Sequence, residues 1–482
     1  MPSSIVSRFR GIVARFPERT AVIAPGQSFT YRELEARVAA TAAAIRERAT
    51  SSTVALLCPN APAFPVLLLA SLWAGKTVAI LPTLAPAPLL KMMAAEVGAE
   101  LVITTEEFVP RLVEVQLACW IGETSATADP LKVPMQPMAQ EASILLYTSG
   151  TTGRPKAVML SERNVLDNAA GSRDAIGFDH RDVMLAILPL FHAYGLTVTV
   201  VLPLTEGATI VIPDRFIPRA ILQTIEQHKV TAFVAVPGQY RVLVKEPITV
   251  DASSLRICIA GAERLPDQVA HEFRERFDRE ILQGYGATEV SPVITVNPPG
   301  ANHIGSAGRP LPNLRLSITD DNGRELPANQ TGEVCVQGSA VMLGYFNDPT
   351  GTARKISDGL LHTGDKGHID NDGYLHLVGR ADDLVKISGE KVYPAEVETA
   401  LETIDGVEEA AVVALPDEKH GSRLAAFILL QAGRSLNESD LRAACRERME
   451  NYKIPRSIAF VEQMPRTATG KTDKRTLATS AV

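Results

Sequence analysis

Residues 147–159, YTSGTTGRPKAVM, contain the densest set of anion-binding groups in this chain. Gly150 and Gly153 allow the backbone to turn sharply and to present amide N–H groups to an anion. Lys156 adds a mobile positive charge, and the hydroxyl donors are Thr148, Ser149, Thr151 and Thr152. The apolar run 144–146 just before them predicts a buried strand. We therefore predict a loop after a strand that holds a polyphosphate.

This segment differs from a Walker A loop, because Arg-Pro separates Gly153 from Lys156 and no Ser or Thr follows the lysine. A short Ser/Thr/Gly cluster is also typical of an ordinary surface turn. The full string TSGTTGxPK, however, resembles the phosphate loop of the adenylate-forming superfamily, which comprises acyl-CoA synthetases, peptide-synthetase adenylation domains and luciferases. The chain differs from the commoner pattern at Ala157 and Glu162, where Gly and His are usual.

The segment 284–289, GYGATE, begins like a dinucleotide-binding fingerprint but ends in Glu289 instead of Gly. It is similar to the superfamily motif GYGxTE. That resemblance implies that Tyr285 stacks on adenine, that Thr288 contacts the α-phosphate region and that Glu289 helps to hold Mg²⁺. A carboxylate near triphosphate oxygens is tolerable only with a bridging cation. The superfamily's nucleotide-binding residues also include Gly284 and Gly286 of this motif.

Two further segments resemble nucleotide-binding motifs of the superfamily. Gly261-Ala262-Glu263 matches the segment that lines the adenine, although alone it is typical of a turn before a helix. Thr363-Gly-Asp365 matches a motif whose Asp accepts hydrogen bonds from the ribose hydroxyls, a task that suits an ionised carboxylate. Three histidines lie close to Asp365, but their spacing matches no metal-ligand template: His362, His368 and His376.

The last hundred residues contain two more matching motifs. Residues 379–394, GRADDLVKISGEKVYP, resemble the junction between the large and small domains. The junction residues that the resemblance assigns are Arg380 at the ribose or phosphate, Asp382 at the hinge, Lys386 at the nucleotide, and Gly389 on a loop presented to a thiol. Residues 465–471, PRTATGK, match PRTxTGK, which makes Lys471 the lysine that reaches the carboxylate and the α-phosphate. Two anions must meet there, so a cation lowers the barrier.

The resemblance also suggests the acid. Adenylation domains for amino acids normally have Asp after the Phe of a segment like Pro189-Leu-Phe191, whereas this chain has His192. An amino acid is therefore not expected, and the small and apolar residues expected at the acyl tunnel favour a medium- or long-chain fatty acid. An aryl or other carboxylic acid is the alternative. The residues expected to bind the acid are His192, Ala193, Tyr194, Val236, Gly238, Gly261, Gly286 and Ala287; those expected to act in catalysis are Lys471, Glu289, Thr148 and His192.

Alternating strand and helix patterns place these motifs. Strand-like runs at 21–24, 54–57, 78–80 and 101–104 alternate with helical periodicity, and so do runs at 183–188, 209–212, 230–236, 255–260 and 281–283. Such alternation predicts two mostly parallel α/β sheets. Several strands end at Gly-rich or polar tips, which in open α/β sheets surround a ligand.

The rest of the chain predicts smaller units. Short Gly-punctuated strands over about 304–379 predict a β-rich subdomain, and a mobile α+β domain is expected to follow. We expect a large domain over 1–380 and a small C-terminal domain over 381–482 that carries the catalytic lysine.

Composition limits the function. The chain has 482 residues, a net charge of −7 and no basic tract, which argues against nucleic-acid binding. The N-terminus lacks the apolar core of a secretory signal, and no stretch predicts a membrane span. Five scattered cysteines form no CxxC pair, so we expect reduced thiols in a cytoplasmic protein. We expect this protein to be a monomer or a homodimer.

The resemblance implies a two-step ligase that uses ATP and Mg²⁺. A carboxylate attacks the α-phosphate of ATP to form acyl-AMP and pyrophosphate, and a thiol then displaces AMP. The thiol is that of coenzyme A or of a carrier protein's phosphopantetheine. A hydrolase is disfavoured because no Gly-x-Ser-x-Gly segment occurs. A nucleotide-binding module without activity is disfavoured because Lys471, Glu289 and Asp365 are all present.

Overall fold

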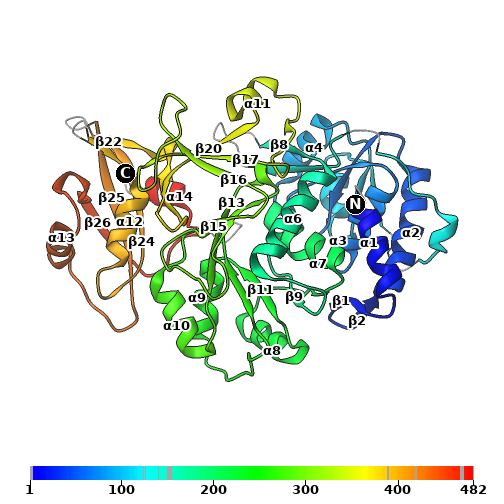
Figure 1. The fold of residues 1–482 in the computed structure, drawn as a ribbon, viewed down its shortest axis with the longest axis horizontal. Coiled ribbons are helices and arrows are strands. Elements are labelled where there is room, and N and C mark those ends of the chain that lie inside the picture. The colour runs from blue at the N-terminus through cyan, green and yellow to red at the C-terminus, as the bar shows by residue number, and fades with distance from the viewer. Residues whose placement is uncertain are drawn as a thin grey trace.

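The computed structural model describes residues 4–122, 124, 126–138, 141–148, 155–387, 390–417, 421–466 and 472–480, with the backbone alone at positions 382, 386, 391 and 421. Two large sheets with helices around them form most of the molecule (Figure 1). A smaller β-rich unit and a C-terminal lobe follow along the chain. The predicted α/β architecture is confirmed.

Among the described residues, seven strands form the first sheet. Their order is β18 (Gly344–Tyr345), β8 (Lys156–Leu160), β7 (Ile144–Thr148), β4 (Thr77–Ile80), β3 (Thr53–Leu57), β5 (Val102–Thr104) and β6 (Cys119–Ile121). The strands from β7 to β6 in this order run parallel, whereas β8 is antiparallel to both its neighbours. The helices of this part of the chain are α1 (Ile5–Arg15), α2 (Tyr31–Arg48), α3 (Ala63–Trp73), α4 (Ala87–Glu96) and α5 (Val109–Glu114).

The second sheet has nine strands in the part of the chain that the structure describes. Their order is β15 (Arg309–Pro310), β14 (Val293–Val296), β13 (Leu282–Gly286), β12 (Ile257–Ala260), β11 (Ala232–Ala235), β9 (Val183–Leu185), β10 (Thr209–Val211), β1 (Thr20–Ala24) and β2 (Gln27–Thr30). Its helices are α6 (Glu162–Ile176), a π-helix (Tyr194–Val201), α7 (Leu202–Glu206), α8 (Pro218–His228), α9 (Pro237–Lys245) and α10 (Asp267–Phe277).

Two features of these sheets differ from the sequence-based expectation. Strand β1 was expected beside the early strands of the first sheet, but it pairs in parallel with β10 of the second sheet. Strand β18 lies within the stretch expected to be a separate β-rich subdomain, but it extends the first sheet by pairing with β8. Both pairings join segments more than 180 residues apart, so local periodicity carries no signal for either.

The remaining elements form the β-rich unit and the C-terminal lobe. The β-rich unit contains β16 (Arg315–Thr319), β17 (Gly332–Gln337), β20 (Leu360–Ile369), β19 (Ile356–Ser357), β21 (Leu375–Arg380) and α11 (Pro349–Lys355). The lobe contains β22 (Val385–Ile387), β23 (Glu390–Val392), α12 (Pro394–Glu402), β24 (Val407–Asp417), β25 (Gly421–Leu430), α13 (Glu438–Arg446), β26 (Ser457–Val461) and α14 (Lys474–Ser480). The sequence pattern predicts a helix over 438–450, but α13 ends at Arg446, four residues earlier.

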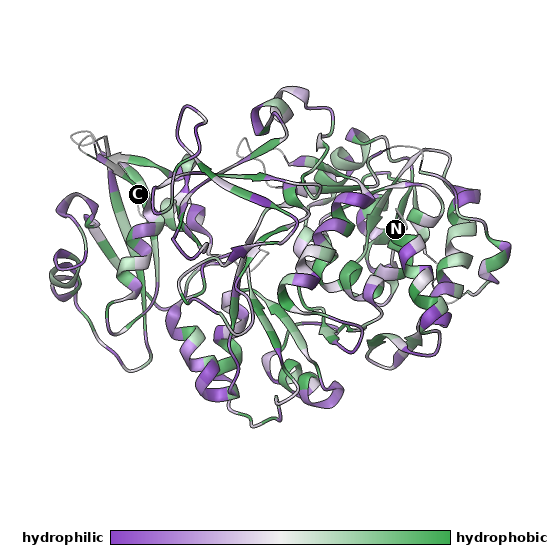
Figure 2. Ribbon diagram, viewed as in Figure 1, coloured by the Kyte–Doolittle hydropathy of each residue, from purple (hydrophilic) through white to green (hydrophobic). Residues whose placement is uncertain are grey.

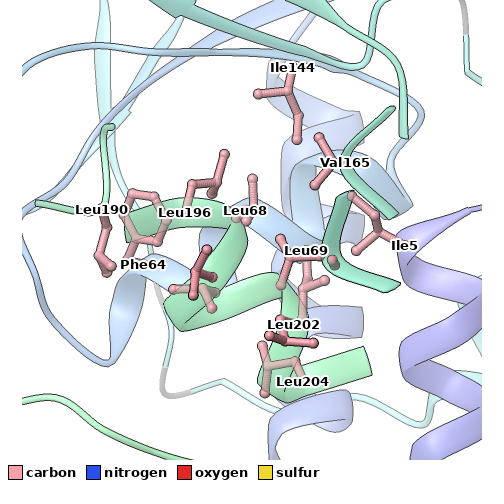
Figure 3. Packing of buried hydrophobic residues seen from close by; sticks show 14 of the residues in the cluster. Ile5, Phe64, Leu68, Leu69, Ile144, Val165, Leu190, Leu196, Leu202 and Leu204 are labelled. Atoms are coloured by element: carbon pink, nitrogen blue, oxygen red, sulfur yellow. The ribbon is translucent and has the colours of Figure 1, made fainter. Parts of the chain in front are cut away.

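A single apolar core joins the two large sheets. Side chains from α1, α3, α6 and the π-helix meet there, among them Ile5, Phe64, Val165 and Leu196 (Figure 3). Helix α3 is apolar on all sides, and each of the residues from Phe64 to Trp73 is buried, as expected of a helix enclosed by other elements. The central strands are hydrophobic, whereas α10 and α13 carry hydrophilic surfaces (Figure 2). The core therefore fixes the two sheets relative to each other and positions their strand ends.

Candidate functional site

The predicted strand tips lie next to one another. Strands β13, β12, β11 and β9 are neighbours in the sheet and run parallel. Val236 follows β11 directly, Gly261 follows β12, and Gly286 is the last residue of β13. Because the carboxyl ends of parallel strands share one edge, the structure brings these residues together as the sequence predicts. Gly238 lies two residues after Val236, as the second residue of α9.

Gly261 and Tyr194 are in close contact at this edge. A Cβ atom at position 261 would lie 2.8 Å from the Tyr194 ring and hydroxyl, so any larger residue would force the ring to shift. Tyr194 begins the π-helix, and His192 precedes it with its ring 4.4 Å from that of Phe191. Ala193, between them, is buried. Two of the residues expected to bind the acid, Tyr194 and Gly261, are therefore in direct contact.

Close backbone packing explains the glycine at position 286. A Cβ atom there would lie 2.2 Å from the carbonyl oxygen of Pro292. That oxygen accepts a hydrogen bond from the amide of Ala287 at 2.9 Å. Gly284, earlier in the same motif, pairs with Val296 of the antiparallel strand β14. The motif therefore turns sharply after β13, and Thr288 and Glu289 follow in a short 3₁₀ turn.

Tyr285 and Asp365 form the first polar cluster of the site. The Tyr285 hydroxyl donates a hydrogen bond to Oδ2 of Asp365 at 2.5 Å, and Arg380 Nη1 lies 3.5 Å from Oδ1. Burial raises the pKa of Asp365, although Tyr285 and Arg380 partly oppose the shift. Burial and the adjacent carboxylate also raise the pKa of Tyr285, which keeps its hydroxyl a donor. The chain thus gathers an aromatic ring, a hydrogen-bond acceptor and a cation from three separate segments.

Lys156 and Glu289 belong to a second cluster, which is centred on Tyr345. Lys156 Nζ lies 2.9 Å from Oδ2 of Asp348 and 4.8 Å from the centre of the Tyr345 ring. The Tyr345 hydroxyl donates to Oε1 of Glu289 at 2.7 Å. Lys156 starts β8 opposite Thr148, so both residues lie at the end of the hairpin where the chain passes from β7 to β8. Pairing of β18 with β8 places Tyr345 beside the lysine.

The two clusters act on each other electrostatically. Glu289 raises the pKa of Asp365 by a smaller amount than burial does, and Arg380 slightly opposes the rise that burial produces in the pKa of Tyr345. Tyr285 and Glu289 also lie only four residues apart, at the end of β13 and in the 3₁₀ turn after it, which joins the two clusters. The structure therefore assembles one polar site from β8, β13, β18, β20 and β21.

The donor set at Glu289 fits a hard divalent cation. Its carboxylate has one oxygen fixed by Tyr345, which orients the other. Carboxylate oxygens are the protein ligands that Mg²⁺ prefers, usually one or two together with phosphate oxygens. Glu289 is thus suited to hold Mg²⁺, which would neutralise charge on a bound polyphosphate.

The turn after β12 contacts the C-terminal lobe. Ala262 adopts a positive φ of 73°, and Oε1 of Glu263 accepts a hydrogen bond from the amide of Thr472 at 3.2 Å. Thr472 directly follows the expected catalytic lysine. Several predicted site residues lie outside the described residues: Ser149, Gly150, Thr151, Thr152, Gly153, Gly389 and Lys471. For Asp382 and Lys386 the structure describes only the backbone, in a 3₁₀ turn and in β22.

The three histidines near Asp365 do not share one centre. His362 Nδ1 lies 3.2 Å from Oε2 of Glu333, whereas His376 Nε2 lies 2.9 Å from Oδ2 of Asp370. The His368 ring stacks on the ring of His376, with centres 5.0 Å apart.

Sequence reasoning missed Tyr345 and Asp348. Both follow a short apolar stretch that resembles no binding motif, and their partner Lys156 lies almost 200 residues earlier. The only local signal is a Gly-Tyr pair before an Asp-Pro helix start. That pattern gives no indication of the phosphate loop, so only the pairing of β18 with β8 reveals it.

Comparisons with known proteins agree with this geometry. Residues 9–346 match the model of the AMP-binding enzyme family, and residues 396–471 match that of the AMP-binding enzyme C-terminal domain. Feruloyl-CoA synthase of Amycolatopsis sp. is 34% identical over 94% of each chain. Long-chain-fatty-acid–CoA ligase of Bacillus subtilis is 30% identical, over 96% of this chain and 92% of that protein.

A solved structure extends the likeness to the whole fold. ATP-bound MatB from Rhodopseudomonas palustris superimposes with a TM-score of 0.91 at 27% identity, covering 100% of this chain and 99% of that one. No helix among the described residues combines the length and the apolar run that a bilayer crossing requires.

Proposed function

The chain belongs to the AMP-binding enzyme family, and from this premise we propose that it is an ATP-dependent acid–thiol ligase that forms acyl-coenzyme A. In the first step, an oxygen of a carboxylate attacks the α-phosphate of ATP, and pyrophosphate leaves. In the second step, the thiol of coenzyme A loses its proton and attacks the acyl carbon, and AMP leaves. The enzyme therefore cleaves one ATP to AMP and pyrophosphate for each thioester.

The convergence of the two polar clusters carries this proposal. Tyr285, Asp365 and Arg380 offer a ring, an acceptor and a cation for a nucleoside, while Lys156 and Glu289 lie where its phosphates would extend. Mg²⁺ held at Glu289 would neutralise phosphate charge as the acid approaches. These side chains bind and orient the nucleotide. Glu289 stands where a dinucleotide-binding fingerprint has its last glycine, which favours a nucleoside triphosphate over a dinucleotide.

Other residues that the sequence motifs single out have proposed roles as well, some of them outside the described part of the chain. Thr148 and the loop 149–153 would donate hydrogen bonds to the phosphates. Lys471 would neutralise the carboxylate and the α-phosphate in the first step. The small domain, 381–482, would then turn about Asp382 and present the Gly389 loop to the thiol in the second step. This exchange of segments would let one active site catalyse two reactions.

The acid is the open variable, and two candidates have support. The apolar residues at the strand tips and the likeness to a long-chain-fatty-acid ligase favour a medium- or long-chain fatty acid. The contact of Tyr194 with Gly261 and the likeness to feruloyl-CoA synthase support an aryl acid as the second candidate, with the Tyr194 ring beside the bound acid. A planar acid would stack on that ring.

A panel assay tests the proposal. The purified chain is given Mg·ATP and labelled pyrophosphate with acetate, octanoate, palmitate, ferulate or indoleacetate, and exchange of the label into ATP is measured. Active acids are then combined with coenzyme A or with a phosphopantetheinylated carrier protein. We expect exchange with at least one apolar acid and thioester formation with coenzyme A. No exchange with any acid would refute the ligase, and thioester formation only with the carrier would reassign the acceptor.

A further inference from the structure

The Glu409 carboxylate, on β24 of the C-terminal lobe, binds side chains from two directions. Arg241, on α9 of the large domain, contacts Oε2, and Arg466 Nη2 donates to the same oxygen at 2.6 Å. Thr472 Oγ1 donates to Oε1 at 2.8 Å and accepts a hydrogen bond from Arg466 Nη1 at 2.9 Å. Glu409 is 5% exposed and Arg241 8% exposed. One buried carboxylate thus joins the two domains and the C-terminal segment.

Because the Glu409 carboxylate is buried, its negative charge must be compensated by nearby cations. Burial alone raises the pKa of Glu409, but Arg241 and Arg466 outweigh that effect and lower it, so the carboxylate is ionised at neutral pH. Removing one member of a buried charge cluster leaves the others without full compensation. The arrangement is therefore stable only while the lobe remains against α9.

Arg466 and Thr472 are the two described residues that flank positions 467–471. Glu409 binds both of them, and the amide of Thr472 also donates to Glu263 at the tip of β12. Glu263 directly follows Gly261 and Ala262, the turn expected to line the adenine. Both flanks of the segment that contains Lys471 are thus held against the large domain at the nucleotide site.

We infer that Arg241 is a positioning residue for the first half-reaction: through Glu409 it holds Arg466 and Thr472 so that Lys471 is presented to the nucleotide. This inference rests on the proposed function and assigns a new role to a residue that touches neither acid nor ATP. The second half-reaction requires the lobe to turn away, which breaks the contact between Arg241 and Glu409. Loss of Arg241 should therefore affect the two half-reactions differently.

A matched control lies on the same helix. Lys245 Nζ is 2.5 Å from Oε1 of Glu408, so this pair crosses the same boundary one turn away. The Lys245 side chain is 52% exposed, however. Within the described residues, Arg466 and Thr472 bind Glu409 and not Glu408. Lys245→Met removes a cation from the interface without disturbing the Glu409 cluster.

The first experiment measures the two half-reactions separately. Pyrophosphate exchange reports acyl-AMP formation, and thioester formation from supplied acyl-AMP and coenzyme A reports the second step. We expect Arg241→Met to slow acyl-AMP formation about tenfold or more, on the scale of a broken buried charge contact, with the second step unchanged or faster. Lys245→Met should change either rate by less than about twofold, as expected of an exposed pair.

A double variant tests the path through Glu409. Since Arg241 and Arg466 act through one carboxylate, Arg241→Met combined with Arg466→Met should slow acyl-AMP formation by less than the product of the two single effects. Equal slowing of both half-reactions by Arg241→Met, or an equal effect of Lys245→Met, would overturn the positioning role. Melting temperatures of all variants identify a loss of activity that comes from unfolding alone. Arg241→Gln keeps a hydrogen-bond donor, so its rate of acyl-AMP formation should lie between those of wild type and Arg241→Met.

A second readout does not depend on activity. Hydrogen exchange of the full chain without substrate should accelerate in peptides covering 457–466 and 472–480 in Arg241→Met but not in Lys245→Met. Unchanged hydrogen exchange in both variants would show that the contact between Arg241 and Glu409 does not hold these segments. If the wild-type chain is inactive with every acid, the proposed function is refuted, and the positioning role with it. This holds even if hydrogen exchange confirms the contact between Arg241 and Glu409.

Discussion

The hydroxyl of Tyr345 donates a hydrogen bond of 2.7 Å to the carboxylate of Glu289, and the same ring lies under the ammonium group of Lys156 at 4.8 Å. One tyrosine therefore orients the candidate Mg²⁺ ligand and supports the candidate phosphate-binding cation. Neither Lys156 nor Glu289 has this partner nearby in the sequence. The relationship makes Tyr345 part of the nucleotide site and gives the first prediction.

Tyr345→Phe keeps the ring under Lys156 but removes the donor to Glu289. A hydrogen bond to a charged group contributes roughly 1.5 kcal/mol, so the Mg²⁺ concentration for half-maximal pyrophosphate exchange should rise about tenfold. Tyr374→Phe is the matched control, because the Tyr374 hydroxyl donates to the carbonyl oxygen of Ala301 instead. An Mg²⁺ dependence equal to that of the control would contradict the role of Tyr345.

Asp365→Ala should weaken ATP use. The carboxylate would accept two ribose hydrogen bonds, and their loss should lower kcat/KM for ATP by about two decades. Tyr285→Phe, which keeps the ring but frees Oδ2 of Asp365, should cost much less. The measurement is exchange rate against ATP concentration, with exposed Asp372→Ala as the control. Similar losses in Asp365→Ala and Asp372→Ala would remove Asp365 from the nucleotide site.

Lys471→Ala should separate the two half-reactions. Loss of one electrostatic stabiliser slows a reaction by about two to three decades, so acyl-AMP formation should fall by that factor. Thioester formation from supplied acyl-AMP should fall far less. Lys474→Ala, which removes a cation that contacts Glu398 at 2.6 Å, provides a nearby control. Equal losses in both steps would refute the assignment of Lys471.

Glu162 makes the stability of the fold depend on pH. Its Oε2 accepts a hydrogen bond from the amide of Ile5 at 2.5 Å at the start of α1, and burial raises its pKa from 4.5 to about 7. The folded state then binds the proton more tightly than the unfolded state. Stability is therefore lost as the pH rises from about 4.5 to about 7, and the loss persists above that range.

Glu162→Gln removes the titrating group and keeps an acceptor for Ile5. The melting temperature of the variant minus that of wild type should increase from pH 5 to pH 8, by an amount that corresponds to about 2 kcal/mol. Glu47→Gln, at a side chain that is 78% exposed, should show no such trend. A flat difference across this range would show that Glu162 ionises normally in the folded chain.

Tyr194 and Gly261 should govern which acids are accepted. Tyr194→Ala opens space beside Gly261 and should raise kcat/KM for the longer or bulkier acids relative to short ones by about tenfold, the scale of one or two methylenes in an apolar pocket. Gly261→Ala brings a methyl group to within 2.8 Å of the tyrosine ring and should lower kcat/KM for all acids. Unchanged relative rates in Tyr194→Ala would place the acid elsewhere.

Local patterns predicted the elements well and their partners only in part. The sequence predicts a capping box from Thr30 and Glu33 and a buried helix from the apolar run 64–73. Both occur, because caps and hydrophobic patterns act within a few residues. The tips after β11, β12 and β13 meet because parallel strands in one sheet must share an edge. These features depend on short-range chemistry.

Long-range pairing accounts for what the sequence did not indicate. Tyr345 reaches Lys156 through β18, and Arg241 reaches Glu409 across the domain boundary. Neither residue belongs to a motif, and each contributes a common side chain whose partner depends on how distant strands pack. The sequence could identify the chemical groups of the nucleotide site but not the residues that orient them.

The place of β1 has a consequence for how the chain is made. Strands β1 and β2 emerge from the ribosome before the other described strands, yet β1 pairs with β10, almost 190 residues later. Strands β3 to β7 are synthesised in the interval, and their sheet is complete only after β18 has been synthesised. The two pairings overlap along the chain, because β8 is made before β10 and its partner β18 after it. A nascent chain released before residue 345 therefore leaves the β8 edge of the first sheet open to aggregation.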